Sequence, residues 1–243
     1  YAENLILAYQ QHYIENMYGI VQMSILSSNS LVGAFFMAIF PILAVLPTST
    51  LNIVDRGTRV DVAYRIRASK ARYMLASYVS VFVTTFLIFT IPFFVELLLE
   101  IFTFGLEANG SPVYANYYTF LDQCQSFFLM DIYFKNRILY AVIYILIFGM
   151  FSAVLALFNY SLTTLPFMKF RVMSFFPVYL VLYLLENIKV EINGYYKKPF
   201  DYVNTLRIFG SYDESVKCWV MVLAALIIVS VIMFIRKIAS DEI

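Results

Sequence analysis

Residues 55–73 read Asp-Arg-Gly-Thr-Arg-Val-Asp-Val-Ala-Tyr-Arg-Ile-Arg-Ala-Ser-Lys-Ala-Arg-Tyr and form a basic segment between two long apolar runs. The chain of 243 residues contains 17 Lys and Arg, and residues 1–54 contain none of them. Lys and Arg in short loops set the orientation of membrane proteins, so this segment decides how the apolar runs beside it are arranged. We call it the basic loop, and its six basic residues are Arg56, Arg59, Arg65, Arg67, Lys70 and Arg72.

The composition indicates a polytopic membrane protein. Apolar residues make up 62% of the chain and charged residues only 14%, whereas a soluble domain of ordinary composition has about 25% charged residues. So few charges cannot cover the surface of a soluble domain, and lipid must therefore cover part of it. The two cysteines do not make a disulfide framework, and the sequence has no basic stripe with interleaved aromatics that would indicate nucleic-acid binding.

Five apolar runs are long enough, or nearly so, for the helix of about 20 residues that crosses a bilayer. Pro41, Pro92 and Pro177 lie within or near the ends of these runs, and they predict kinks. The expected fold class is all-α, with five visible transmembrane helices in a single domain that covers residues 1–243. The expected helices lie at about 25–47, 74–99, 138–160, 172–187 and 217–235.

The distribution of Lys and Arg predicts a multi-pass orientation in the cell membrane. Three regions carry basic residues and are predicted to be cytoplasmic: the loop 51–73, the link 161–171 with Lys169 and Arg171, and the tail with Arg236 and Lys237. Three others are predicted to be extracellular: residues 1–24, the loop 104–135 and the loop 188–216. The first two carry mostly acidic residues, whereas the third has mixed charge and is assigned by parity.

The predicted extracellular regions contain more than simple connections. Residues 1–22 have apolar residues at helical spacing, and residues 114–134 are rich in Tyr and Phe. Because aromatic side chains favour the membrane interface, we expect both stretches to form interfacial helices, at least in part. The chain starts outside without a signal peptide, so we also expect a further spanning helix before residue 1, which would give six spans.

The sequence lacks the motifs of an ATP-binding or catalytic subunit. It has no G-x-x-x-x-G-K-[ST] phosphate-binding loop, so ATP and Mg²⁺ would bind in a separate partner. Its single histidine, His12, excludes both the H-E-x-x-H metalloprotease motif and a Ser–His protease within a span. We therefore expect no enzyme activity, no cofactor and no metal site in this chain.

The basic loop has the pattern of a short amphipathic helix at about 59–68. Thr58 and Asp61 fit a capping box, and Val60 and Tyr64 fall on one helical face. Such a helix either anchors the loop to lipid phosphates or docks it on a cytoplasmic protein. We favour docking, because orientation alone would not require six clustered basic residues or a capped helix.

A group of short motifs lies between Phe36 and about Phe104. An apolar helix ends in Pro41-Ile42-Leu43-Ala44-Val45-Leu46-Pro47, and the cluster Asp55-Arg56-Gly57 follows it. Arg67-Ala68-Ser69 and Lys70-Ala71-Arg72-Tyr73 then open the next helix. These motifs resemble the membrane subunits of ABC-2-type ABC transporters. The rest of the chain resembles that family in layout only, and it shows five spans where the family has six.

The resemblance implies that the basic loop is a coupling helix seated in a groove of a separate ATPase subunit. It also implies that two permease subunits pair, as a homodimer or a heterodimer. ATP-driven closure of the ATPase would move the loop and the helices on either side of it. We expect polar contacts from Arg56, Arg59 and Arg65 and a buried face of Val60 and Tyr64. The full set of expected coupling residues is Asp55, Arg56, Gly57, Arg59, Val60, Tyr64, Arg65 and Arg67.

Four other residues are candidates for a role outside the basic loop. Glu96 and Glu100 are four residues apart, so they share a helix face near the outer end of the second run. They either lie in water at the interface or attract a cationic substrate at its exit. Cys124 and Cys218 both fall on the predicted outer side and either form a disulfide or remain free thiols. Trp219 is expected to be an interfacial anchor.

Together these features predict the transmembrane subunit of an ATP-driven exporter. Its substrate would be amphipathic or lipophilic, such as a peptide, an antimicrobial, a drug or a lipid. The main alternative is a membrane sensor or assembly module whose basic loop binds a soluble partner or anionic lipid. A secondary carrier is a weaker alternative, because neither a paired inverted repeat nor a charge pair at the midplane is apparent.

Overall fold

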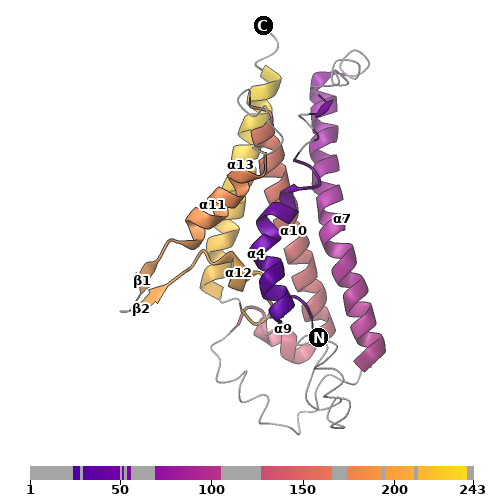
Figure 1. Ribbon diagram of the computed structural model, residues 1–243, viewed down its shortest axis with the longest axis vertical. Coiled ribbons are helices and arrows are strands. Elements are labelled where there is room, and N and C mark those ends of the chain that lie inside the picture. The colour runs from indigo at the N-terminus through magenta and orange to yellow at the C-terminus, as the bar shows by residue number, and fades with distance from the viewer. Residues whose placement is uncertain are drawn as a thin grey trace.

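The computed structural model is an elongated bundle of helices with a two-stranded arm at one side (Figure 1). It describes residues 24–27, 30–49, 51, 54–55, 69–104, 127–165, 174–192, 195–210 and 213–239. In chain order the elements are α4 (Leu31–Val45), α7 (Lys70–Phe104), α9 (Met130–Lys135), α10 (Arg137–Thr163), α11 (Phe176–Glu186), β1 (Val190–Ile192), β2 (Tyr195–Lys197), α12 (Tyr202–Thr205) and α13 (Asp213–Ala239).

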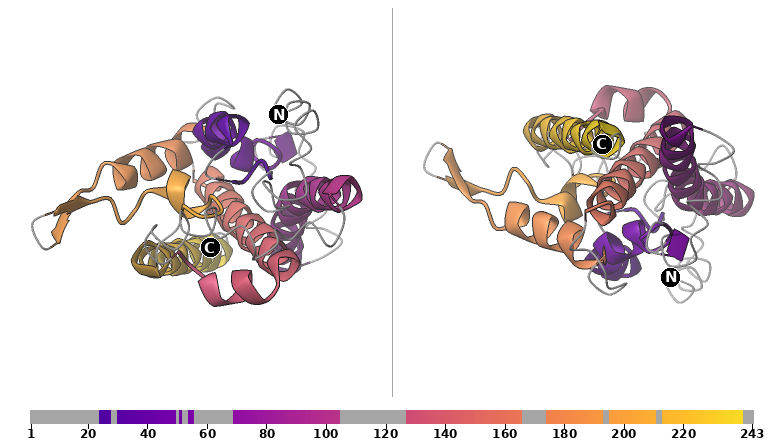
Figure 2. Two further views of the ribbon diagram at one scale, coloured as in Figure 1. Left: turned by 90° about the horizontal axis from the view of Figure 1, so that it is seen from below. Right: turned by 90° about the horizontal axis from the view of Figure 1, so that it is seen from above.

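Helix α10 lies at the centre of the bundle and contacts α4, α7, α11 and α13 (Figure 2). In its most apolar stretch 67% of the residues are buried, compared with 33% in α7 and 17% in α13. Asn136 caps its start, because the side-chain oxygen accepts a hydrogen bond from the backbone N–H of Leu139 at 3.0 Å. Lipid would therefore cover α7 and α13 far more than α10.

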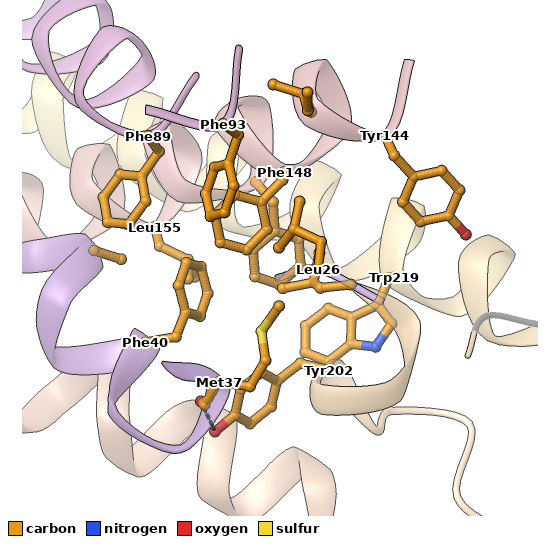
Figure 3. Packing of buried hydrophobic residues seen from close by; sticks show 14 of the residues in the cluster. Leu26, Met37, Phe40, Phe89, Phe93, Tyr144, Phe148, Leu155, Tyr202 and Trp219 are labelled. Carbon is orange, nitrogen blue, oxygen red and sulfur yellow. Dashed lines mark hydrogen bonds between the residues drawn. The ribbon is translucent and has the colours of Figure 1, made fainter. Parts of the chain in front are cut away.

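The core at the middle of the bundle is built from aromatic rings of α4, α7 and α10 (Figure 3). The ring of Phe148 lies 4.9 Å from Phe40, 5.2 Å from Phe93 and 5.8 Å from Phe89, measured between ring centroids. The contacts with Phe89 and Phe93 are edge-on, which is a favoured geometry for aromatic pairs. One side chain of α10 thus joins three helices.

The direction of each helix follows from these pairs. Phe36 contacts Phe93 and Phe40 contacts Phe89, so α4 and α7 run antiparallel. Figure 1 shows α7 running opposite to α4, α10 and α13. The C-terminal ends of these three helices therefore lie at the same end of the bundle as the start of α7.

Three helices are long and apolar enough to cross a membrane, at Ala71–Thr103, Arg137–Thr163 and Glu214–Ala239. Helix α4 has 15 residues and α11 has 11, so they extend only about 22 Å and 16 Å. Both lengths are less than the roughly 30 Å of a bilayer core. The structure supports a membrane-embedded helical protein, and the arrangement with five or six spans stays a prediction.

The five apolar runs predicted from the sequence all contain a helix, but some boundaries differ. Helix α7 begins directly after Ser69 and continues to Phe104, so it is longer than the predicted range 74–99. Helix α4 begins at Leu31 rather than near residue 25, because residues 24–27 form a turn that bonds to other parts of the chain. Pro177 lies in the first turn of α11, where its missing N–H costs no helical hydrogen bond.

A short β hairpin extends the arm that α11 begins (Figures 1 and 2). Strands β1 and β2 are antiparallel, with Val190 opposite Lys197 and Ile192 opposite Tyr195. We predicted no strand in the loop 188–216. The signal was present, because the sequence between the strands is Asn193-Gly194, the pair most favoured in tight hairpins.

Substitution of Gly149 by Val should loosen the bundle. A Cβ atom at this position would overlap Cγ2 of Thr90 and lie 3.1 Å from the ring of Phe86, both on α7. Overpacking of this kind costs about 1–3 kcal/mol. We expect a lower midpoint of thermal unfolding in detergent for Gly149→Val than for Met150→Val, because Met150 is exposed on the same helix. Equal midpoints would show that α7 and α10 are not in this close contact.

Candidate functional site

A short segment before α4, residues 24–27, is bonded to two distant parts of the chain. The backbone N–H of Ile25 donates a hydrogen bond to Oε1 of Glu96 on α7, at 2.6 Å. The carbonyl of Leu26 accepts one from the N–H of Ile208 at 2.8 Å, and Ser27 pairs with Ile208 as a parallel bridge. We call residues 24–27 together with Glu96, Glu100, Arg207 and Ile208 the junction.

Arg207 holds the junction against the start of α4. Its guanidinium donates hydrogen bonds from one nitrogen to the carbonyls of Ser27, at 3.0 Å, and Ser30, at 2.9 Å. The side chain is only 8% exposed, and this burial lowers the pKa of the guanidinium from its ordinary value. Lowering a pKa that is normally above 12 leaves the charge in place, so Arg207 acts as a fixed cationic donor.

The start of α4 is shaped to receive this segment. The Oγ atom of Ser30 accepts a hydrogen bond from the N–H of Gly33 at 3.0 Å, which caps the helix. Gly33 also lets the backbone of Ile25 approach the helix, because a Cβ atom there would overlap the Ile25 carbonyl oxygen. The absence of a side chain at Gly33 is therefore what allows the junction to lie on α4.

Tyr202 of α12 secures the same region from the other side. Its hydroxyl donates a hydrogen bond to the carbonyl of Met37 at 3.4 Å (Figure 3). Burial is the main cause that raises the pKa of Tyr202, and the nearby Glu186 carboxyl adds to it. The hydroxyl therefore stays protonated and remains a donor at any physiological pH. The side chains of Tyr202 and Arg207 thus both attach this segment to α4 or to its N-cap.

Glu100 lies one helical turn beyond Glu96, and the two carboxylates interact electrostatically. Only 3% of Glu100 is exposed, and within the described part of the chain neither of its carboxylate oxygens has a hydrogen-bond partner. Its neighbours on the same face of α7, Phe93 and Leu97, are buried as well. This burial argues against the interpretation that places both carboxylates in water.

At the opposite end of α7 the structure describes the two borders of the basic loop. The hydroxyl of Tyr73 donates a hydrogen bond to Oδ2 of Asp55 at 2.8 Å. This bond holds the two borders together at the point where the loop leaves the bundle. The expected coupling residues between these borders, from Arg56 to Arg67, and the predicted amphipathic helix at 59–68 lie outside the described residues.

Of the two cysteines, the structure describes Cys218. Cys218 is partly buried in the first turns of α13 and forms no disulfide with a described residue. Cys124 lies outside the described residues, so the choice between a disulfide and two free thiols is not tested. Residues 1–23 also lie outside them, and their interfacial helix stays a prediction. Trp219 was expected at the interface, but it is only 2% exposed and its ring lies 5.2 Å from Phe151. The prediction for Trp219 is therefore wrong, because Phe151 of α10 and Phe200, which precedes α12, lie against its ring.

Arg207 is the functional candidate that the sequence analysis missed. It was treated as one charge of a mixed loop, whereas its apolar neighbours Leu206 and Ile208 indicate a buried position. No family model, no curated protein and no solved structure matches this chain. Its function is therefore to be inferred from the basic loop, the junction and the helix that connects them.

Replacement of Arg207 by Met should destabilise the protein. It removes the two charge-assisted hydrogen bonds to the carbonyls of Ser27 and Ser30, each of which keeps one backbone donor. A hydrogen bond that involves a charged group contributes about 1.5–3 kcal/mol. We expect a lower midpoint of thermal unfolding in detergent for Arg207→Met, whereas Lys198→Met should have little effect, because Lys198 is exposed in the same segment. If both variants unfolded at the wild-type midpoint, Arg207 would not hold the junction.

Proposed function

We propose that this chain is the membrane-spanning subunit of an ATP-driven exporter that works with a separate ATPase subunit. The observation that carries the proposal is the basic loop, which joins α4 to α7 and is closed at its base by the Asp55–Tyr73 hydrogen bond. A closed loop that is rich in Arg is suited to bind a soluble protein as a unit. Because the chain has no phosphate-binding loop, the energy source must lie in such a partner.

Helix α7 is suited to carry movement from the basic loop to the far side of the membrane. It has 35 residues and so extends about 52 Å. Its first turns hold Tyr73 beside the basic loop, and its last turns hold Glu96 and Glu100 at the junction. A tilt of α7, driven by the ATPase, would therefore act on the junction and open an outward path.

The arrangement of the helix ends supports this orientation. The start of α7 lies at the same end of the bundle as the C-terminal ends of α10 and α13 (Figure 1). The sequence places its basic residues beside these ends, at 51–73, 161–171 and 236–237. By the positive-inside rule this end is cytoplasmic, and the junction then faces outward.

In this proposal two permease subunits pair, each with five or six spans, and an amphipathic or lipophilic substrate leaves near Glu96 and Glu100. The chain itself does not hydrolyse ATP. The rival function is a membrane sensor or assembly module whose basic loop binds anionic lipid or another soluble protein. That reading is favoured only by the charge of the loop, since Arg side chains bind lipid phosphates as readily as carboxylates.

The exporter proposal predicts the behaviour of substitutions in the basic loop. Arg59→Glu and Tyr64→Glu should each lower the amount of ATPase that copurifies with the full protein from native membranes by about tenfold, because a buried interface charge without a partner costs more than 1.4 kcal/mol. Lys189→Glu is the control, since it makes the same change of charge as Arg59→Glu at an exposed site beside β1.

Two results would count against the proposal. One is copurification of an ATPase that is equal for wild type and both loop variants. The other is a basic loop whose only measurable interaction is salt-sensitive binding to anionic vesicles, which would favour the rival function. A rise in the turnover of the copurified ATPase when the permease is present would support the exporter directly.

A further inference from the structure

Glu100 is a carboxylate in an environment that does not match its chemistry. It is almost fully buried, and within the described residues no donor reaches either of its oxygens. The adjacent Glu96 adds a second negative charge, and one of its oxygens already accepts the N–H of Ile25. Buried carboxylates in proteins are otherwise paired or hydrogen-bonded, so the structure supplies acceptors here but no matching donor.

We propose that Glu100, assisted by Glu96, binds the ammonium or guanidinium group of an amphipathic cation. The ligand's N–H groups would donate to the two oxygens of Glu100 that have no donor in the described chain, and its positive charge would offset both carboxylates. Ionisable groups within membrane helices are costly and usually serve a function, which fits a binding role. As the identity of an exported substrate, this inference rests on the proposed function.

The composition of the site favours an organic cation over a metal ion. Among the described residues no group of three or more His, Cys, Asp and Glu is placed to hold a metal. Calcium takes about six to eight oxygen ligands, and magnesium requires near-octahedral geometry. Two carboxylates on one helix, of which one is already hydrogen-bonded, fall short of either set. One ammonium group needs only a few acceptors, which this pair provides.

The surroundings of Glu100 also favour a ligand with an apolar part. Phe93 and Leu97 are buried on the face of α7 that carries Glu100, and the ring of Phe36 from α4 lies edge-on to Phe93 at 5.8 Å. A small hydrated cation would gain nothing from these neighbours. An alkyl chain or an aromatic group next to the cation would contact them and remain out of water.

The site is also placed where ligand binding can affect the helices. Glu96 holds Ile25, and the same segment is bonded to Arg207 through Ser27. A cation on Glu100 would weaken the hydrogen bond from the Ile25 N–H to Glu96, because its positive charge partly offsets the negative charge of the neighbouring Glu96 carboxylate. Loading of the site would therefore loosen the attachment of residues 24–27 to α7.

The test is a binding measurement on the full chain alone, in nanodiscs of phosphatidylcholine, with tritiated dodecylammonium as the probe. Empty nanodiscs give the background, and dodecanol is the neutral comparison. We expect saturable binding of dodecylammonium in wild type and a loss of about tenfold to a hundredfold in affinity for Glu100→Gln, as for removal of a hydrogen bond to a charged group. Asp131→Asn is the matched control, because Asp131 is an exposed carboxylate at the same end of the bundle.

Three outcomes would overturn the proposal. They are equal affinities of wild type and Glu100→Gln, an equal loss in Asp131→Asn, and wild-type binding of dodecanol as tight as that of dodecylammonium. The result does not depend on the exporter, because no ATPase is present. A cation site without a copurifying ATPase would reject only the proposed function, and a copurifying ATPase without a cation site would reject only this inference.

A second measurement uses wild-type protein, in case Glu100→Gln does not fold. Dicyclohexylcarbodiimide modifies carboxyl groups in apolar surroundings, and mass spectrometry of the peptide locates the adduct. Dodecylammonium at about ten times its Kd should slow modification of Glu100 by about tenfold, since only the unoccupied fraction would react. Dodecanol should not slow it. A rate that dodecylammonium leaves unchanged would contradict the proposal.

Discussion

The close contact of α7 with α10 is the constraint on which the rest of the structure depends. Gly149 has no side chain, so Thr90 and Phe86 of α7 lie directly against the backbone of α10. At this distance the ring of Phe148 reaches Phe93 of α7 and also Phe40 of α4. Dispersion between such groups falls steeply when a gap opens. A wider spacing at Gly149 would therefore loosen α4 as well as α7.

Helix α7 is held near its middle and has bonded groups toward both ends. The first turn carries the Tyr73–Asp55 bond at the base of the basic loop, and the last turns carry Glu96 at the junction. Helix α4 connects the same two places, since it begins beside the junction and ends near the loop. Two helices thus join the borders of the basic loop to the junction, and a third, α10, contacts both of them.

The sequence was sufficient for the features that depend on local pattern. Each apolar run contains a helix, and the start of α10 carries an ordinary capping residue, Asn136. It was insufficient where distant contacts decide the conformation. The later start of α4 depends on Glu96 and Ile208, and the burial of Trp219 depends on Phe151 and Phe200. Periodicity describes one helix at a time, so it cannot show which faces meet.

Arg207 and Glu100 are both buried charges near the start of α4, but the chain treats them differently. The guanidinium of Arg207 donates hydrogen bonds to two backbone carbonyls, so its charge stabilises the fold. Glu100 receives no donor from the described residues. A charge that the fold already satisfies has little affinity left for a ligand, whereas an unsatisfied one gains the full interaction when a partner arrives. Among the described residues this difference favours the acidic end of α7, rather than Arg207, as the position where a ligand would bind.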